Sequence, residues 1–504
     1  MTRRALLIAL VSLASSAYFY EGGGWNQNTR FDLVRAIVER HTVRIDAYHD
    51  NTGDKAHLGD HYYTDKAPGA SLTAVPAVAV TYGLMKAFGV DAGSDRAVVA
   101  LSYVATVAAA ALPTACIAFC VFVIAGRLGA TSTAAAFAAL VCALGTPVWA
   151  YATVLYGHAL AGAGLIVAFL GALILGEPSK PRRQITLAVL TGLAAGWAVI
   201  TEFPAAIPSA LIVGFALWQI MRTDRTRLLP VAGALGAGLG AAASVFMVYN
   251  ELAFGKLVYV GYTSEEGFEA MRTGFFGVHW PKLSVMYELL FGTRRGLLPL
   301  APVLAIVPVG FWLLIRDRAT RAAGLVAGAV ALYFLLMTSG YAYWNGGWSY
   351  GSRHLGPGLA FMCIGLAPVW MLVPTVVRAP ILVLALVSVL QSLVAVATTP
   401  QLPIEYQRPM QDLLWPAFKS GDFPIGWQSF QELRPPPGPM SQLARQRVPR
   451  ASWNVGQLVG LRGHASLIPL LIIWIGAAFV WRHIGITEDL VRGRTKADSR
   501  SQNV

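Results

Sequence analysis

Residues 97–125 read AVVALSYVATVAAAALPTACIAFCVFVIA and contain no charged side chain. A helix rises 1.5 Å per residue, so about 20 apolar residues cross a hydrocarbon core about 30 Å thick. This stretch is therefore long enough to span a membrane as one helix. The composition of the whole chain agrees, because 56% of its 504 residues are hydrophobic and only 13% are charged. In a soluble domain roughly a quarter of the residues are charged.

Apolar runs of comparable length recur along the chain and predict an all-α polytopic bundle of about 12 to 13 transmembrane helices. The other runs cover residues 4–20, 131–149, 158–176, 185–201, 205–221, 228–249, 296–315, 322–339, 355–374, 379–397 and 465–481. The run at 4–20 follows Arg3 and Arg4, as the apolar part of a signal peptide would. Because it ends without a small-residue cleavage site, we interpret it as a retained first helix.

The net charge of +13 indicates membrane topology in a protein of this class, because positively charged connectors prefer the cytoplasm. Basic residues gather at 3–4, 180–183, 222–227, 316–321 and 482–500. All five segments fall on one side if a further apolar run, 69–89, lies re-entrant or along the surface, which gives 12 crossings with both termini cytoplasmic. If 69–89 crosses the membrane fully, the chain makes 13 crossings, and the basic segments agree less well with a cytoplasmic position. This topology stays an alternative. The basic charge predicts contact with membrane lipids and no nucleic-acid partner.

This topology divides the chain into three parts. A transmembrane core covers 1–397 and includes a long external loop at 21–96, a second external loop covers 398–464, and a last helix with a basic cytoplasmic tail covers 465–504. The external side also receives 147–158, the region around 202, 250–295 and 340–354, and these loops hold nearly all Trp, Tyr, His and carboxylate residues outside the tail. We therefore predict a composite site on the outer, periplasmic face of a bacterial inner membrane.

The first external loop begins with an amphipathic helix that Asn28 or Thr29 can cap. Its apolar side chains recur at helical spacing and its charged side chains fall on the other face: Phe31, Val34, Ile37 and Val38 against Asp32, Arg35, Glu39 and Arg40. This pattern is typical of a helix lying in the membrane interface.

Residues 46–66 of the same loop hold five Asp, three His and two Lys. Such density favours a functional segment over a solvated cap. His49, His57 and His61 could bind a divalent cation, although their spacing matches neither a Cys/His zinc motif nor an EF-hand. The metal therefore stays unknown, and the sequence predicts no cofactor with certainty.

Two elements of the loop follow one another in a distinctive order, Thr29-Arg30-Phe31 with its helix and then Tyr63-Thr64-Asp65-Lys66-Ala67-Pro68. In order and layout they resemble the GT-C superfamily of membrane glycosyltransferases, in particular its aminoarabinose-transferase and protein O-mannosyltransferase branches. The later segments 249–255, 291–302 and 344–354 are similar to those of bacterial GT-C-like proteins. The resemblance implies transfer of a sugar from a polyprenyl-phosphate donor to a periplasmic or membrane-bound glycan, lipid or protein acceptor.

One departure concerns the catalytic carboxylate. Where the resemblance leads us to expect an acidic motif before Thr29, this chain has Gln27-Asn28, and an amide cannot act as a general base. A positioned carboxylate contributes about 10² to 10⁴ in rate. The candidates for this role are Asp32, Asp54, Asp65 and Glu202, and the sequence does not choose among them.

The donor phosphate calls for cations aimed at developing negative charge. The candidates are Lys66, Arg294, Arg295, Arg353 and His354. Arginine offers a two-pronged fork to phosphate oxygens, although Arg294 and Arg295 could instead reach lipid headgroups. The further candidates for substrate binding are Asn28, Arg30, Tyr63, His158, Trp344, Trp348 and Tyr350, and the aromatic ones could alternatively belong to the interfacial belt.

Two other functions compete with a glycosyltransferase. A lipid or saccharide transporter, or flippase, would need broken helices in two related halves, and no such symmetry is visible. A non-catalytic relative that binds envelope components would explain the absent acidic motif.

Overall fold

The computed structural model describes residues 2–178, 180–264, 268–424 and 451–501. Its first helices are α1 (Thr2–Ala17), α2 (Trp25–Arg40), α3 (Gly69–Ala87), α4 (Asp95–Thr106), α5 (Leu112–Arg127), α6 (Ser132–Leu144), α7 (Val148–Ala152), α8 (His158–Leu175), α9 (Pro181–Thr201), α10 (Ala206–Thr223) and α11 (Leu228–Phe254). The chain continues through α12 (Leu283–Phe291), α13 (Leu297–Leu300), α14 (Val307–Arg316), α15 (Arg321–Gly340), α16 (Gly356–Ile364), α17 (Leu366–Leu372), α18 (Thr375–Thr398), α19 (Trp415–Ser420), α22 (Val455–Leu458) and α23 (Ile468–Ser501). Four short strands complete the structure: β1 (Phe19–Glu21), β2 (Lys55–Leu58), β3 (His61–Thr64) and β4 (Ser452–Asn454).

Ten helical segments of the described chain are long and apolar enough to cross a membrane, among them Asp95–Arg127, which contains the stretch 97–125. Two shorter apolar segments, Ser132–Leu144 and Pro302–Arg316, and helix α1 add to these. The chain is therefore a multi-pass membrane protein, and the prediction of an all-α polytopic bundle is confirmed.

Three of the predicted runs are interrupted within their length, one of them, 296–315, at Ala301 between α13 and the segment that begins at Pro302. Run 131–149 is divided between α6 and α7 at Gly145-Thr146-Pro147. Run 355–374 is divided between α16 and α17 at Gly365. The backbone of Gly365 packs against α14 so closely that a β-carbon at Gly310 would collide with the Gly365 carbonyl. Proline removes a backbone donor and glycine admits close backbone approach, so these residues set the breaks.

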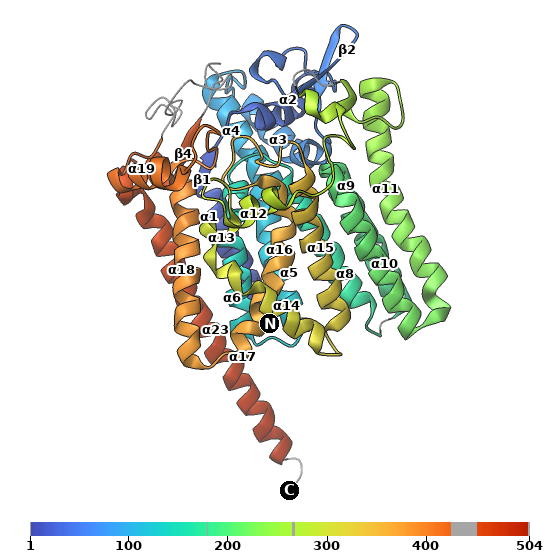
Figure 1. Cartoon of the computed structure of the whole chain (residues 1–504), viewed down its shortest axis with the longest axis vertical. Coiled ribbons are helices and arrows are strands. Elements are labelled where there is room, and N and C mark those ends of the chain that lie inside the picture. Colours follow the sequence, from blue (N-terminus) through green and yellow to red (C-terminus); the bar gives the residue numbers. More distant parts are fainter. Residues whose placement is uncertain (1, 179, 265–267, 425–450, 502–504) are drawn as a thin grey trace.

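Helices α2 and α3 lie at one end of the bundle, which is uppermost in Figure 1. Gly69, the first residue of α3, packs directly against Thr201 at the end of α9. Tyr103 of α4 donates a 2.8 Å hydrogen bond to the carbonyl of Ala17 at the end of α1. Helix α3 therefore begins at the level where α1 and α9 end, and Figure 1 shows it in the same upper layer as α2. Gly69–Ala87 is nevertheless one of the ten segments long and apolar enough to cross a membrane, so the number of crossings, 12 or 13, stays a prediction.

The basic connectors lie at the opposite end. The connections from α8 to α9, from α10 to α11 and from α14 to α15 are all lowermost in Figure 1. An ion pair between Arg127 and Glu177 joins two of the lower connectors. Charge is thus segregated as expected for cytoplasmic connectors. Residues 425–450 of the predicted loop 398–464 and residues 502–504 of the predicted tail lie outside the described part of the chain.

Two antiparallel strand pairs organise the upper end. Strand β1 pairs with β4, with Phe19 opposite Asn454, and so ties the first external loop to the segment before α23. Strands β2 and β3 form a hairpin in which Lys55 lies opposite Thr64. The residues that flank this last pair, Asp54 and Asp65, are thereby brought together at the base of the hairpin.

Helix α2 differs from its prediction in two respects. Its N-cap is Gly24, with φ of 97°, so neither Asn28 nor Thr29 caps it. The prediction of a solvated face that includes Asp32 is also wrong, because Asp32 is buried. The helix is covered by α3, by the β2–β3 hairpin and by the turn at residues 49–51, which leaves little of it facing water.

Candidate functional site

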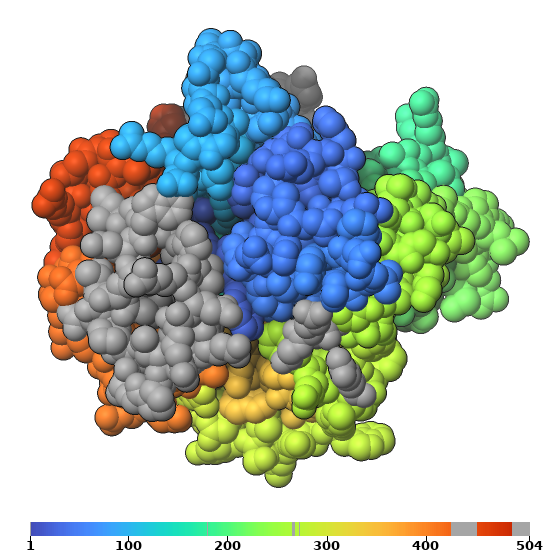
Figure 2. All heavy atoms as spheres, turned by 90° about the horizontal axis from the view of Figure 1, so that it is seen from above, coloured from blue at the N-terminus to red at the C-terminus, as the bar shows by residue number. Residues whose placement is uncertain are grey.

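A cavity of about 800 Å³ opens at the upper end of the bundle. Its walls come from the first loop, from the upper ends of α8 and α9, and from the loop between α15 and α16. Figure 2 looks down on this face, where the first loop (blue) adjoins the yellow-green segment that follows α11. Segments far apart in the sequence thus meet around one hollow.

The predicted site residues divide into two groups. Those that line the cavity are Arg30, Asp54, Lys66, His158, Glu202, Trp348, Arg353 and His354. Those that lie outside its lining are Asn28, Asp32, Tyr63, Asp65, Arg294, Arg295, Trp344 and Tyr350. Two of the four candidate carboxylates therefore face the cavity.

Arg30 and Glu202 form an ion pair across the cavity wall. Arg30, on α2, donates from its Nη2 to Oε1 of Glu202 at 2.8 Å, and its Nε donates to Asn26 at 3.1 Å. Glu202 occupies the short connection between α9 and α10, and the Nδ1 of His158 lies 3.6 Å from its Oε1. Gly157 is required beside this pair, because a β-carbon there would stand 2.3 Å from the Glu202 carboxylate.

Lys66 lies between two carboxylates at the base of the hairpin. Its Nζ is 2.5 Å from Oδ2 of Asp65 and 3.1 Å from Oδ2 of Asp54. Asp65 is completely buried, and burial raises its pKa to about 6, against the opposing effect of the Lys66 charge. Because one ammonium faces two carboxylates, a proton can be added to this cluster at modest cost.

Arg353 is a cation of the cavity wall that lies near Tyr156, Asp54 and Glu202. No ion pair in the described part of the chain includes it, and its guanidinium lies over the ring of Tyr156, 5.0 Å from the centroid. The neighbouring His354 packs edge-on against His158 with ring centroids 5.5 Å apart, and its buried Nε2 has no hydrogen-bond partner among the described residues. The Nε2 of His354 can therefore engage a ligand oxygen, and the guanidinium of Arg353, which also forms a hydrogen bond with Tyr156, lines the same wall.

Arg294 and Arg295 support the cavity from behind. Arg295 is buried and donates to the carbonyls of Ser349, Gly347 and Leu402 at 2.5, 3.0 and 3.1 Å. Burial lowers its pKa to about 10. Arg294 donates to the carbonyl of Ile404. These guanidinium groups therefore hold the loop before α16 and the segment after α18. The Arg295 donors are engaged by these carbonyls.

The other outlying candidates have structural contacts. Asp32 accepts a hydrogen bond from Asn51 at 3.0 Å, and burial raises its pKa to about 8. Asn28 donates to the carbonyl of Asn51. Tyr63 packs against Phe254, and the backbone carbonyl of Tyr350 accepts a bond from Tyr151 at 2.6 Å. The carbonyl of Trp344 accepts from Ser352 at 2.6 Å.

Sequence reasoning missed several residues of the lining. Gln27 and Gln401 are amides that approach one another at Gly24, and Tyr156 and Tyr262 add aromatic walls. Lone amides and loop tyrosines carry no sequence motif. The one sequence signal for this part of the lining was that Gln27-Asn28 stands where the family resemblance predicts an acidic motif.

The acidic and histidine residues of the loop do not form an evident cation site. No group of three or more His, Cys, Asp or Glu side chains that could hold a metal occurs within the described ranges. His49 and His57 stack on the two faces of Tyr62, and His61 pairs with Asp46 at 2.8 Å. The ammonium of Lys66 occupies the position between Asp54 and Asp65 that a cation would need.

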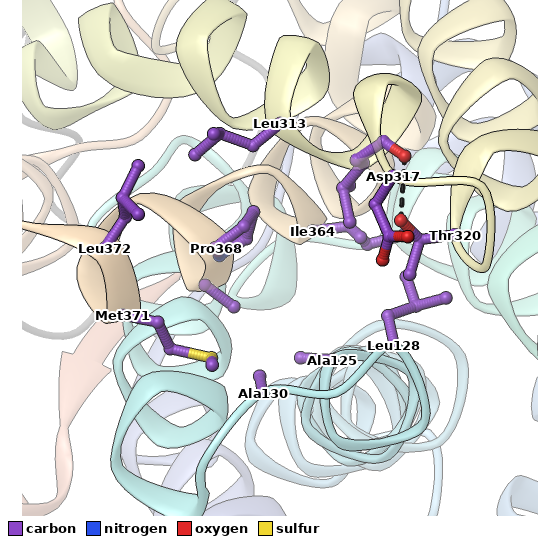
Figure 3. Close-up of a pocket in the computed structure, with 12 residues that line it drawn as sticks. Ala125, Leu128, Ala130, Leu313, Asp317, Thr320, Ile364, Pro368, Met371 and Leu372 are labelled. Carbon is purple, nitrogen blue, oxygen red and sulfur yellow. Dashed lines mark hydrogen bonds between the residues drawn. The ribbon is translucent and has the colours of Figure 1, made fainter.

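A second pocket, of about 290 Å³, lies at the lower end between α5, α14 and α17. Figure 3 shows Asp317 and Thr320 at one side of it and Met371 and Leu372 at the other. Asp317 is its one ionisable lining residue among those described. A pocket with so few polar groups offers little for catalysis, so the upper cavity is the candidate active site.

Comparison with known proteins gives structural relatives only. No family model and no curated protein matches the sequence. The structure is similar to that of ArnT from Cupriavidus metallidurans bound to undecaprenyl phosphate, with a TM-score of 0.50 and 16% identity over 76% of this chain and 62% of that one. The apo state of that ArnT gives a TM-score of 0.48, 18% identity and coverage of 74% and 60%.

The archaeal oligosaccharyltransferase AglB from Archaeoglobus fulgidus, in complex with an inhibitory peptide and a dolichol-phosphate, gives a TM-score of 0.43 and 10% identity over 78% of this chain and 55% of that one. The chain thus spans about three fifths of the length of the first relatives. At this identity the likeness to ArnT establishes the fold and not the substrate. The chain has the fold of the GT-C superfamily of membrane glycosyltransferases.

Proposed function

We propose that this chain is a membrane glycosyltransferase that moves a sugar from a polyprenyl-phosphate donor to a glycan, lipid or protein acceptor. The reaction would take place at the periplasmic face of a bacterial inner membrane. The GT-C fold supports a transferase of this class, and the ArnT structure that shares the fold is described as bound to undecaprenyl phosphate.

One observation carries the proposal. Within a single polar cavity, the carboxylates of Asp54 and Glu202 line the same space as the guanidinium of Arg353, which has no ion pair among the described residues. Sugar transfer from a lipid phosphate needs a group that receives a proton and a cation that receives a leaving phosphate.

Arg353 and His354 are the proposed phosphate ligands. A guanidinium forms paired hydrogen bonds with phosphate oxygens, and Tyr156 beneath Arg353 holds its plane. Lys66 is engaged by two carboxylates, so it is the weaker candidate for the phosphate. As the bond between the anomeric carbon and the phosphate oxygen breaks, the electron pair leaves with the phosphate and the charge develops beside Arg353.

Asp54 is the proposed base. The acceptor hydroxyl would attack the anomeric carbon and pass its proton to this carboxylate. Such a direct displacement inverts the configuration of the sugar. Asp54 shares the ammonium of Lys66 with Asp65, and unlike Asp65 it lines the cavity that an acceptor would enter. Glu202 already forms an ion pair with Arg30 at 2.8 Å. For that reason Glu202 is the second candidate.

The test is sugar transfer by the purified protein in proteoliposomes, with radiolabelled polyprenyl-phosphate sugars and a membrane extract as acceptor. We expect transfer from at least one donor and its loss in Asp54→Asn and Arg353→Ala variants that remain folded. If none of the donors supports transfer, or if both variants transfer like the wild type, a transporter or a non-catalytic envelope protein becomes the better account.

A further inference from the structure

The N-terminus of α2 opens onto the same cavity. Trp25, Asn26 and Gln27 are the first three residues of this 16-residue helix, and all three line the cavity. Gly24 at the N-cap offers no capping side chain, and no acidic residue lies in the first turn. The first amide groups of a helix lack intrahelical partners and carry the positive end of its dipole.

Gln27 gives an independent indication of a ligand. Its side chain is 4% exposed, and its Nε2 has no hydrogen-bond partner in the described part of the chain. Leaving a buried donor unsatisfied costs about 1–3 kcal/mol. Native proteins rarely accept this cost without a functional reason.

The charged side chains that flank the start of α2 in the sequence are engaged with other partners. Arg30, one turn along, is paired with Glu202 and holds the Oδ1 of Asn26. Glu21 precedes the helix, but its Oε1 accepts hydrogen bonds from Thr399 at 2.9 Å and from Gln401 at 2.8 Å. The nearest carboxylate in the sequence is therefore bound elsewhere.

We infer that the N-terminus of α2, together with the amide of Gln27, forms a second oxyanion subsite beside the one at Arg353. It takes a phosphate or carboxylate group through neutral N–H donors, as helix N-termini do. The identity of the ligand rests on the proposed function: the oxyanion is the second phosphate of a diphosphate-linked donor or an anionic group of the acceptor.

The test is calorimetric titration of the full chain in nanodiscs with inorganic phosphate and with pyrophosphate. Gln27→Glu places a negative charge in the subsite and is expected to weaken anion binding by about tenfold or more. Gln27→Met removes only the amide, and we expect a loss of about threefold. Leu58→Glu, which adds the same charge at the exposed tip of the β2–β3 hairpin, is the matched control, and thermal melting shows that each variant is folded.

The two sources of the oxyanion give different results. A diphosphate donor is indicated if pyrophosphate binds the wild type more tightly than phosphate and Gln27→Glu abolishes the difference. An acceptor group is indicated if phosphate fills two independent sites, one lost in Arg353→Ala and the other in Gln27→Glu. The inference is overturned if both Gln27 variants bind both anions as tightly as Leu58→Glu. Because this titration needs no turnover, its failure is distinct from a failure of sugar transfer.

Discussion

The two hollows of this molecule differ in what their walls contain. The upper cavity collects Arg30, Lys66, Glu202 and Arg353 from segments distant in sequence, whereas the lower pocket has Asp317 as its one described ionisable group. Both are open spaces between helices. The difference teaches that concavity alone does not identify a site, and that carboxylates and cations gathered around one hollow do.

Replacing the proposed base should have the largest effect. Asp54→Asn is expected to lower kcat for sugar transfer by about 10² to 10⁴, the contribution of a positioned general base. The matched control is Asp317→Asn in the lower pocket, which should leave kcat unchanged. Equal losses in both variants, measured in proteoliposomes, would contradict the contrast between the two hollows.

Arg353 and Arg295 allow a second comparison within the upper end, between an arginine that lines the cavity and one that holds backbone carbonyls. Arg353→Lys should lower kcat/KM by about tenfold to a hundredfold, because a charged hydrogen bond is worth about 1.5–3 kcal/mol. Its Tm should change little.

Arg295→Lys should instead lower Tm, since the carbonyls of Ser349, Gly347 and Leu402 lose a common donor. Thermal melting and kinetics of both variants separate the two roles. The assignment fails if Arg353→Lys melts early with normal turnover per folded molecule.

A pH effect is expected from Asp32, which lies outside the cavity. Burial raises its pKa from 3.8 to about 8, so the folded state holds this proton in a range where the unfolded state has released it. Stability from this group is fully present below about pH 4 and is lost as the pH rises through 8. Asp32→Asn should therefore raise Tm at pH 9 relative to the wild type, and this gain should vanish at low pH. A gain that is the same at all pH values would disprove the linkage.

Filling the lower pocket should have the smallest effect. Ala130→Leu places three further carbon atoms in this space and is expected to stabilise the fold by up to about 2.4 kcal/mol, at about 0.8 kcal/mol per buried carbon group. Sugar transfer should stay within about twofold of wild type. Denaturation of the variant in detergent measures the gain, and a large loss of transfer would give the lower pocket a function.

The sequence predicts the bundle well because apolar length is a local property. The stretch 97–125 needs no tertiary information to be recognised as a span. By contrast, the burial of Asp32 and the start of α2 at Trp25 depend on how the hairpin and α3 cover that helix. Helical periodicity alone therefore missed the burial of Asp32 on the charged face of α2.

The site is predicted only in part, for the same physical reason. The cluster at residues 46–66 identifies Asp54 and Lys66 by density, and their meeting follows from the hairpin register. The pairing of Arg30 with Glu202, 172 positions apart, cannot be seen in the sequence. The different roles of Arg295 and Arg353 cannot be seen in the sequence either. Both are arginines in loops near aromatic residues, and only the structure shows which groups each one contacts.

The most direct test of the central claim is a structure of the protein in nanodiscs with a polyprenyl phosphate bound. The account predicts phosphate density in the upper cavity, within hydrogen-bond distance of Arg353 and on the same side as Asp54. Phosphate density at the lower pocket beside Asp317, or in the upper cavity but out of reach of Arg353, would contradict it.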